Sequence, residues 1–278
     1  MTTKVAIVGA TGTMGTLAAG LIEANPEFSV FASLGSKDSF DGMLGADLVL
    51  DVTVPGVSQS VVDFAVSHGI NVLVGTSGWS GDRILALEHL LRATPDVGVV
   101  IVPNFSMGSV LATAFAAMAA QFYDSIEIIE AHSASKLDSP SGTAVRTAEL
   151  MAAARSGVGP VSAPHTDQRA RGQQVASVPI HSLRLQGVIA KQDVVFGGTG
   201  EVLTLSHETI SSSAYEAGML LALQAARTAT GVTVGLDRVI DLPKLLAART
   251  AADPQRGDEK WAPVPEQVSG QAARVTSA

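Results

Sequence analysis

KVAIVGATGTMG, residues 4–15, is the stretch of sequence that decides the fold. Its first five residues are largely apolar and β-branched, which predicts a short buried strand. Gly9, Gly12 and Gly15 follow, and the apolar periodicity of residues 14–24 predicts a helix. A glycine turn between a strand and a helix is typical of a dinucleotide-binding site, because a pyrophosphate can approach the amides of the helix N-terminus. The alternative is an ordinary strand-to-helix turn.

Short buried strands and helices continue to alternate after this turn. Strands are predicted at residues 28–33, 46–53, 71–75 and 97–102, and helices at residues 58–68 and 82–92. Such a βα series packs as a doubly wound parallel sheet, which predicts an α/β fold of the Rossmann type. The sheet is expected to end near Pro103.

The pattern changes after Asn104 and indicates a second, α+β domain. Helices are predicted at residues 109–122 and 140–155, strands at 125–131, 180–185, 188–196 and 201–209, and a long loop at 156–177. The helix predicted at 214–228 resembles those of the first half, so we expect the chain to return to the first domain. The expected division is a dinucleotide-binding domain at 1–105 completed by 213–248, a substrate domain at 106–212, and a disordered tail at 249–278.

The composition favours a small-molecule partner in the cytoplasm. A net charge of -8 and only 18 lysine and arginine residues in 278 argue against a nucleic-acid surface. The absence of cysteine excludes disulfides and thiolate metal sites and fits a reducing compartment. No apolar run is long enough to cross a membrane, and His165, His181 and His207 have no metal-ligand spacing, so we expect no membrane contact and no metal. These three histidines are interpreted as structural or surface residues.

Two features of the first domain bear on the nucleotide. An acidic residue about 20 positions after the glycine turn would bind the ribose hydroxyls of NAD, but no carboxylate follows the second strand before Asp38. Ser36 and Lys37 stand there instead and could contact a 2′-phosphate, which favours NADPH over NADH; a solvated loop lysine is the alternative. The segments 75–78 and 103–106 follow two predicted parallel strands, where open α/β sheets bind ligands, and together could line a nicotinamide pocket.

The most informative segment is EAHSASKLDSPSGT, residues 130–143. His132 ends a predicted strand and Lys136 follows in a loop, so both can face one pocket. Ser139 is expected as the N-cap of the next helix with Pro140 in its first turn, which would leave the backbone amides of residues 141–143 free to bind an anion. A carboxylate there, beside an ammonium and an imidazole able to donate a proton, fits an acid-assisted hydride acceptor. The alternative is a capped helix with an unrelated surface histidine and lysine.

These motifs together resemble one family, the 4-hydroxy-tetrahydrodipicolinate reductases, also called dihydrodipicolinate reductases. The resemblance covers residues 1 to about 248. It rests on VGATGTMG at the N-terminus, DVTVP at 51–55, GTSGW at 75–79, PNFSMG at 103–108, EAHSASKLDSPSGTA at 130–144, and the later stretches HSLRLQG and FGGTGEVLTLSHE. It implies a Rossmann domain with an α+β substrate and tetramerisation domain. It also implies NAD(P)H-dependent reduction of dehydrated 4-hydroxy-tetrahydrodipicolinate, a small anionic cyclic substrate, in lysine and diaminopimelate biosynthesis.

The family's functional residues transfer to matching positions. His132 becomes the proton donor or acceptor and Lys136 a second donor, while Ser141, Gly142 and Thr143 bind a substrate carboxylate. Ser133 occupies the place of a second, substrate-contacting histidine. The implied nucleotide contacts are Gly9, Ala10, Thr11, Gly12, Thr13, Met14, Gly75, Thr76, Ser77, Val102, Pro103, Asn104 and Phe105, to which the residue pattern adds Ser36 and Lys37.

Some positions depart from the family pattern. Ser133 and Ser212 replace a histidine and an arginine, and Thr11 and Thr13 stand where some members have basic residues. Loss of a charge-assisted hydrogen bond weakens binding by roughly 1.5 to 3 kcal/mol. The departures motivate a second hypothesis, a divergent paralogue that reduces another small cyclic imine or unsaturated acid. A third is a dinucleotide-binding homologue without catalysis, against which His132 and Lys136 count.

Overall fold

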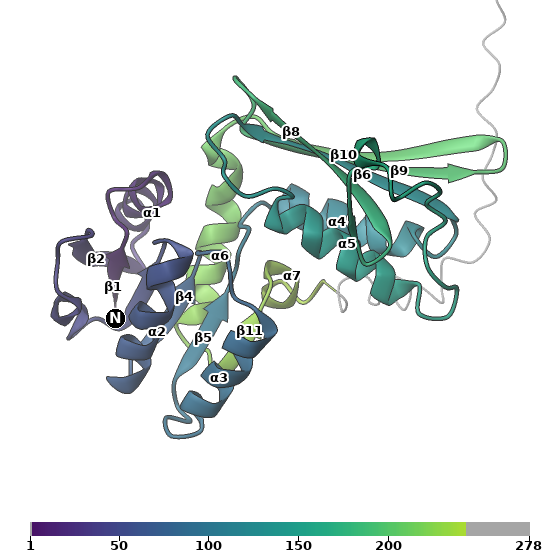
Figure 1. Cartoon of the computed structure of the whole chain (residues 1–278). Coiled ribbons are helices and arrows are strands. Elements are labelled where there is room, and N and C mark those ends of the chain that lie inside the picture. The colour runs from purple at the N-terminus through teal and green to yellow at the C-terminus, as the bar shows by residue number, and fades with distance from the viewer. Residues whose placement is uncertain (1, 243–278) are drawn as a thin grey trace, which may run out of the picture. The chain divides into compact units, whose positions relative to one another are not determined.

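The alternation predicted for the first half of the chain is present in the computed structural model, which describes residues 2–242 (Figure 1). Six parallel strands form the first sheet, in the order β11-β5-β4-β3-β1-β2. The strands are β1 (Thr3–Val8), β2 (Phe28–Leu34), β3 (Leu48–Asp51), β4 (Asn71–Val74), β5 (Gly98–Ile101) and β11 (Gly231–Val234). The predicted fold class is confirmed. The predicted tail, 249–278, lies outside the described residues.

Helices cover both faces of this sheet. They are α1 (Thr13–Glu23) and α6 (Glu216–Ala226) on one face and α2 (Pro55–Ser67) and α3 (Gly81–Leu91) on the other, with a short turn η1 (Phe40–Met43) beside α2 and α7 (Leu236–Val239) after β11. In β1, Val5 and Ile7 pack on the α1 side while Ala6 and Val8 pack on the α2 side. Burial on both faces explains why the strands read as continuous apolar runs.

The strand β11 is absent from the sequence-based prediction, which placed no element after residue 228. It pairs in parallel with β5, from Gly231 against Gly98 to Val234 against Ile101. The residues of β11, GVTV, are only partly buried and lack the continuous apolar run that marks β3, β4 and β5, so only the pairing with β5 reveals the strand. The chain after α6 therefore adds an edge strand to the first sheet.

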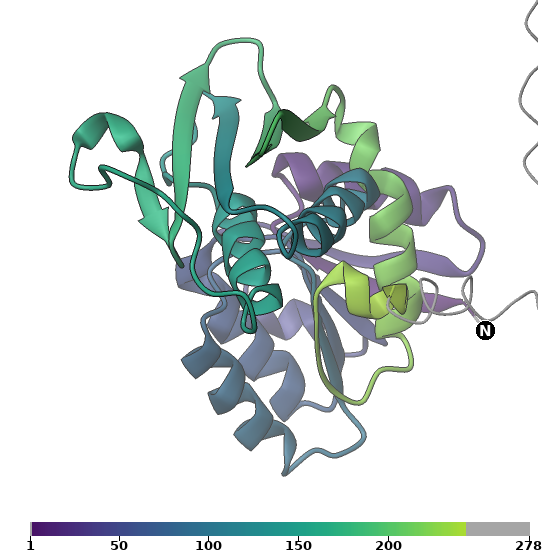
Figure 2. The same cartoon turned by 90° about the vertical axis from the view of Figure 1, so that its right-hand side faces the viewer.

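A second sheet of five strands, in the order β10-β9-β6-β8-β7, follows in the chain (Figures 1 and 2). Its strands are β6 (Ser125–Ser133), β7 (Gln173–Val175), β8 (Val178–Leu185), β9 (Ala190–Gly198) and β10 (Glu201–Thr209). The β6–β8 pair is parallel and the other pairs are antiparallel, so the sheet is mixed. The helices α4 (Met107–Ala119) and α5 (Gly142–Ala154) pack on one face around Ile128, Met151 and Phe196. A turn, η3 (Ser212–Tyr215), leads into α6.

Two details of the predicted second half are wrong. The expected loop at 156–177 contains a short turn, η2 (Arg169–Arg171), and the strand β7, which pairs with β8. The helix α5 begins at Gly142, and its N-cap is Ser141, whose hydroxyl accepts from the amide of Ala144 over 3.2 Å. Ser139 was expected in that role. A contact with a residue outside this segment favours Ser141 as the N-cap, because the Ser141 amide donates to the carboxylate of Glu130 over 3.3 Å.

Candidate active site

The register of the second sheet gathers polar side chains on the face that α4 and α5 cover. Directly paired residues project from the same face. One row across the sheet is therefore Arg184, His132, Ala190 and Thr209, and the next row is Ser182, Glu130, Gln192 and His207. These residues come from β8, β6, β9 and β10, in that order. The carboxyl end of β6 thus carries a polar patch on an otherwise apolar face.

A pocket of about 270 Å³ lies over this patch. It brings His132 and Lys136 together with Ser141 and Thr143 at the start of α5. The same pocket is lined by residues that follow strands of the first sheet or open α1, namely Met14, Gly75, Pro103, Asn104 and Phe105. Residues expected to hold substrate and residues expected to contact nicotinamide therefore share one cavity.

His132 is held by a buried carboxylate. Its Nδ1 lies 2.6 Å from Oε2 of Glu130, whose side chain is 0% exposed, and Arg184 donates to both oxygens of that carboxylate over 3.0 Å. Burial raises the pKa of Glu130, but the hydrogen bonds from His132, Arg184 and Ser182 outweigh it and lower the pKa to about 2. An ionised carboxylate only accepts hydrogen bonds, so Nδ1 of His132 carries a proton and Nε2 is the nitrogen available to a ligand.

Lys136 also has a partner in its own loop. Its Nζ lies 2.7 Å from Oδ1 of Asp138. Burial raises the pKa of Asp138, but the hydrogen bond and charge of Lys136 more than offset this, so the pKa is below its usual value. Lys136 is about one-quarter exposed and Asp138 more than half exposed. An anion in the pocket would therefore compete with a solvated carboxylate for the ammonium.

The start of α5 provides fewer free amides than the sequence suggested. The Ser141 amide is taken by Glu130, which leaves the amides of Gly142 and Thr143 at the open end of the helix. The Thr143 hydroxyl accepts from Nδ2 of Asn104 over 3.4 Å, and the same Nδ2 donates to Ser109 over 2.9 Å. A carboxylate at this helix end would meet two amides and the Thr143 hydroxyl, together with the helix dipole.

His207 and Gln192 line the pocket, although the sequence analysis interpreted His207 as structural or surface and did not consider Gln192. Nε2 of His207 lies 3.2 Å from the Ser106 hydroxyl, and burial lowers the pKa of His207 below its usual value. Nε2 of Gln192 donates to Thr147 over 3.1 Å, while its Oε1 is buried and has no partner among the described residues. Only the pairing of β9 with β10 and β6 brings these residues to His132, so no local pattern could have found them.

Ser133 is not brought to the pocket. It follows His132 in β6, so its side chain projects to the opposite face of the sheet. Its hydroxyl lies 2.9 Å from the hydroxyl of Ser135. Of the described residues, those that line the pocket do not include Ser133 or Ser212. Ser212 lines the cavity beside the glycine turn instead.

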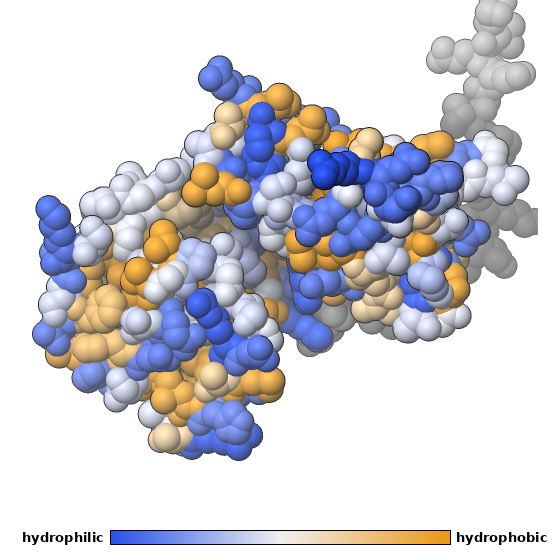
Figure 3. All heavy atoms as spheres, viewed as in Figure 1, coloured by the Kyte–Doolittle hydropathy of each residue, from blue (hydrophilic) through white to orange (hydrophobic). Residues whose placement is uncertain are grey.

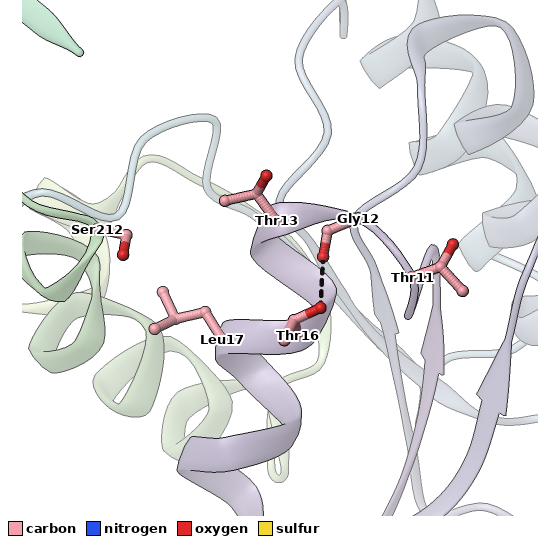
Figure 4. A pocket seen from close by; sticks show the side chains of 6 residues that line it. All are labelled: Thr11, Gly12, Thr13, Thr16, Leu17 and Ser212. Carbon is pink, nitrogen blue, oxygen red and sulfur yellow. Dashed lines mark hydrogen bonds between the residues drawn. The ribbon is translucent and has the colours of Figure 1, made fainter. Parts of the chain in front are cut away.

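The glycine turn is shaped for close approach of a ligand. Gly9 has φ +90, and a Cβ there would lie 2.5 Å from the Val52 carbonyl oxygen, so no other residue fits without displacing backbone. A second cavity of about 460 Å³ opens beside the turn and is lined by Thr11, Gly12, Thr13, Thr16, Leu17 and Ser212 (Figure 4). The open N-terminus of α1 and these small and hydroxyl side chains fit a dinucleotide pyrophosphate.

The remaining predicted nucleotide residues are spread around these two cavities. Gly9 and Ala10 donate backbone hydrogen bonds to the Leu34 carbonyl, which ties the glycine turn to the end of β2. Thr76 and Val102 are buried after β4 and β5, Ser77 is exposed beside Thr76, and Ser36 and Lys37 are exposed after β2. Among residues 2–242, no helix could span a membrane. The same residues hold no cluster of three or more metal-ligating side chains.

The fold and the two cavities define a class, an oxidoreductase that binds a pyridine dinucleotide on a Rossmann-type sheet and substrate beside a second, mixed sheet. Within that class the chain belongs to the dihydrodipicolinate reductase family, as the sequence motifs predicted. The family's N-terminal model, "Dihydrodipicolinate reductase, N-terminus", matches residues 3–105 and its C-terminal model, "Dihydrodipicolinate reductase, C-terminus", matches residues 108–240.

Individual relatives agree with this assignment. The chain is 67% identical over 279 residues to the 4-hydroxy-tetrahydrodipicolinate reductase of Clavibacter michiganensis subsp. michiganensis, with all of both chains covered. It is 41% identical to the protein of that name from Streptomyces griseus, over 86% of this chain and 98% of the relative. A solved structure of dipicolinate-bound dihydrodipicolinate reductase from Paenisporosarcina sp. TG-14 is 27% identical, with a TM-score of 0.69 over 86% of this chain and 99% of that one.

Proposed function

We propose that the chain reduces the dehydrated form of 4-hydroxy-tetrahydrodipicolinate to tetrahydrodipicolinate with a reduced pyridine nucleotide, in the biosynthesis of lysine and diaminopimelate. The observation that carries the proposal is the shared cavity, in which His132, Lys136 and Thr143 face Met14 and Phe105. Relatives that carry this reductase name match the chain over its whole length, and a related structure holds dipicolinate, a cyclic dicarboxylate.

The substrate's charge matches the pocket. One carboxylate binds the amides of Gly142 and Thr143 and the Thr143 hydroxyl, at the positive end of α5. Lys136 leaves Asp138 to pair with the substrate and polarises the conjugated imine. Placed in this way, the ring lies against the residues that close the nucleotide side of the cavity, Gly75 and Phe105.

His132 supplies the proton. Nδ1 stays bonded to the carboxylate of Glu130, which stabilises the ring when it is protonated, and the proton on Nε2 passes to the substrate as it is reduced. The bound nucleotide supplies the hydride. The glycine turn holds its pyrophosphate through Gly9, Ala10, Thr11, Gly12, Thr13 and Met14, and Gly75, Thr76, Ser77, Val102, Pro103, Asn104 and Phe105 surround its nicotinamide end.

Both NADPH and NADH are candidates for the nucleotide. Ser36 and Lys37, exposed after β2, favour NADPH because an ammonium and a hydroxyl there can bind a 2′-phosphate. Fluorescence titration with each nucleotide tests this choice, and clearly tighter binding of NADH would contradict it.

The protein acts as a cytoplasmic homotetramer in this proposal. The face of the second sheet away from α4 and α5 carries Ile129, Leu183 and Leu185, whose side chains are 38%, 42% and 47% exposed. Figure 3 shows apolar residues among charged ones near β8. An apolar sheet face of this kind gains stability when a second copy covers it. Light scattering of the purified chain gives the mass that checks the assembly.

A divergent paralogue is not favoured, because two relatives with the reductase name share 67% and 65% identity and because Ser133 and Ser212 lie outside the substrate cavity. The deciding experiment follows nucleotide oxidation when the synthase makes 4-hydroxy-tetrahydrodipicolinate in place from pyruvate and aspartate semialdehyde. We expect turnover of about 1 per second or faster. Intact nucleotide binding without turnover would show that the substrate is a different one.

A further inference from the structure

Arg184 has no role in the sequence analysis, yet it lies at the centre of the polar patch. It belongs to β8 and pairs directly with His132 of β6, so both side chains project from the same face. Its side chain is 20% exposed. Arg184 does not line the pocket, and therefore any effect on the reaction acts through other residues.

The guanidinium of Arg184 holds Glu130 in one orientation. Nη1 donates to Oε2 and Nη2 to Oε1 of the carboxylate, each over 3.0 Å. A forked pair of this kind fixes the plane of a carboxylate, which a single ammonium cannot do. Because Oε2 also accepts from Nδ1 of His132, the orientation of the imidazole depends on the plane that Arg184 sets.

The same guanidinium also holds the loop that carries Lys136. Nη2 donates to the backbone carbonyl of Asp138 over 2.5 Å, and the Asp138 carboxylate pairs with Nζ of Lys136 over 2.7 Å. A further bond from Nη1 to the Leu183 carbonyl, 2.6 Å long, anchors the guanidinium to its own strand. One side chain therefore connects the two residues that face the substrate, although no hydrogen bond or ion pair between described residues joins His132 to Lys136 directly.

We propose that Arg184 is a positioning residue that sets the geometry of His132 and Lys136 together. The inference rests on the proposed function. Without the fork, Glu130 can rotate, His132 no longer keeps its proton on Nδ1, and Nε2 is not reliably available to exchange a proton with the substrate. The loop at 136–138 loses its anchor at the same time, so Lys136 no longer stays beside the ring of the substrate.

The test compares Arg184→Met with Arg227→Met in the full-length protein. Arg227 also pairs with a glutamate, Glu27, over 3.3 Å, and it lines neither cavity. We expect Arg184→Met to lower kcat on the order of a hundredfold, as the loss of general acid–base catalysis does, with nucleotide binding unchanged. Arg227→Met is expected to keep kcat within about twofold. Arg184→Lys, which restores the charge without the fork, is expected to recover only part of the loss.

A second readout does not depend on turnover. Nitrogen-15 spectra of the histidine rings, with His132 assigned from a His132→Asn variant, show which ring nitrogen carries the proton in the neutral form. Wild type and Arg227→Met are expected to show the Nδ1–H form, and Arg184→Met a mixture of both forms. If Arg184→Met keeps both the kcat and the His132 signals of the control, the inference is overturned. If the wild type does not turn over the substrate, the proposed function fails, while the ring signals still decide the role of Arg184.

Discussion

The carboxylate of Asp38 accepts a hydrogen bond from the amide of Gly35 over 2.7 Å, at the end of β2. A Cβ on Gly35 would lie 3.6 Å from that carboxylate and 3.9 Å from the Thr11 side chain of the glycine turn. Asp38 therefore folds back to the end of β2, the region in which Rossmann-type folds bind the ribose of the nucleotide. This contact could not be predicted from the sequence, because Asp38 lies three residues after Gly35, at the end of the strand where a carboxylate was expected.

This contact predicts how nucleotide choice responds to substitution. Asp38→Asn removes a charge that repels a 2′-phosphate, and Lys37→Met removes one that attracts it. The interaction of an exposed charge with the 2′-phosphate contributes about 1 kcal/mol to the binding free energy. We therefore expect the ratio of NADPH to NADH affinity to rise about three- to tenfold in Asp38→Asn and to fall by a similar factor in Lys37→Met. Titration by nucleotide fluorescence measures both ratios. Unchanged ratios in both variants would place the 2′-position away from residues 37 and 38.

His132→Ala tests the proton donor. We expect kcat to fall by a factor on the order of 10² to 10⁴, the usual contribution of a general acid, while nucleotide affinity stays the same. His181→Ala is the matched control, because His181 also pairs with a glutamate of β6, Glu127, over 2.7 Å but on the opposite face of the sheet. Equal rates for the two variants would remove His132 from the mechanism.

Lys136→Met tests how much the ammonium of Lys136 contributes to the reaction of the anionic substrate. Loss of one charge-assisted hydrogen bond costs roughly 1.5 to 3 kcal/mol, so we expect kcat/KM to fall about ten- to a hundredfold. Lys4→Met is the control, because Lys4 is an exposed residue of β1 that lines neither cavity. Steady-state rates over a range of substrate concentrations give the answer. A change in nucleotide affinity instead would move Lys136 from the substrate to the cofactor.

Local sequence signals predicted most of the fold and half of the site. The glycine turn, the strand that carries His132 and the helix predicted from residue 140 are each encoded within about fifteen residues, so local patterns predict them without knowledge of a partner strand. The N-cap of that helix is the exception, because it depends on Glu130. The row of the sheet that contains Gln192 and His207 could not be predicted in this way. Gln192 and His207 reach His132 only through the pairing of β9 with its neighbours, and β11 exists only through its pairing with β5. Alternation along a strand shows which face is buried, but it does not show which strand is the partner.

Acid conditions are expected to weaken the protein through Glu130. Its pKa is lowered from 4.5 to about 2 in the folded state, so the folded protein binds this proton less readily than the unfolded chain. The stabilisation is present in full above about pH 5 and is lost as the pH falls from 4.5 towards 2. For a shift of this size it amounts to about 3 kcal/mol. Urea unfolding at pH 7 and pH 3 measures the free energy of unfolding at each pH. The difference between the two values is expected to be smaller in Glu130→Gln than in wild type, and an equal difference would contradict the ion-pair network.

Gly108→Ala tests His207 without touching its ring. A Cβ at Gly108, in the first turn of α4, would lie 2.8 Å from Cδ2 and 2.9 Å from Nε2 of His207, so the ring must move away from the Ser106 hydroxyl. The cost to folding is small, since the contact is with the end of a side chain and alanine favours the helix. We expect kcat/KM to fall about tenfold, for the loss of one hydrogen bond in the pocket. Gly56→Ala is the control, because a Cβ there meets nothing within 4 Å. If both variants keep full activity and similar unfolding temperatures, His207 only fills space beside the substrate.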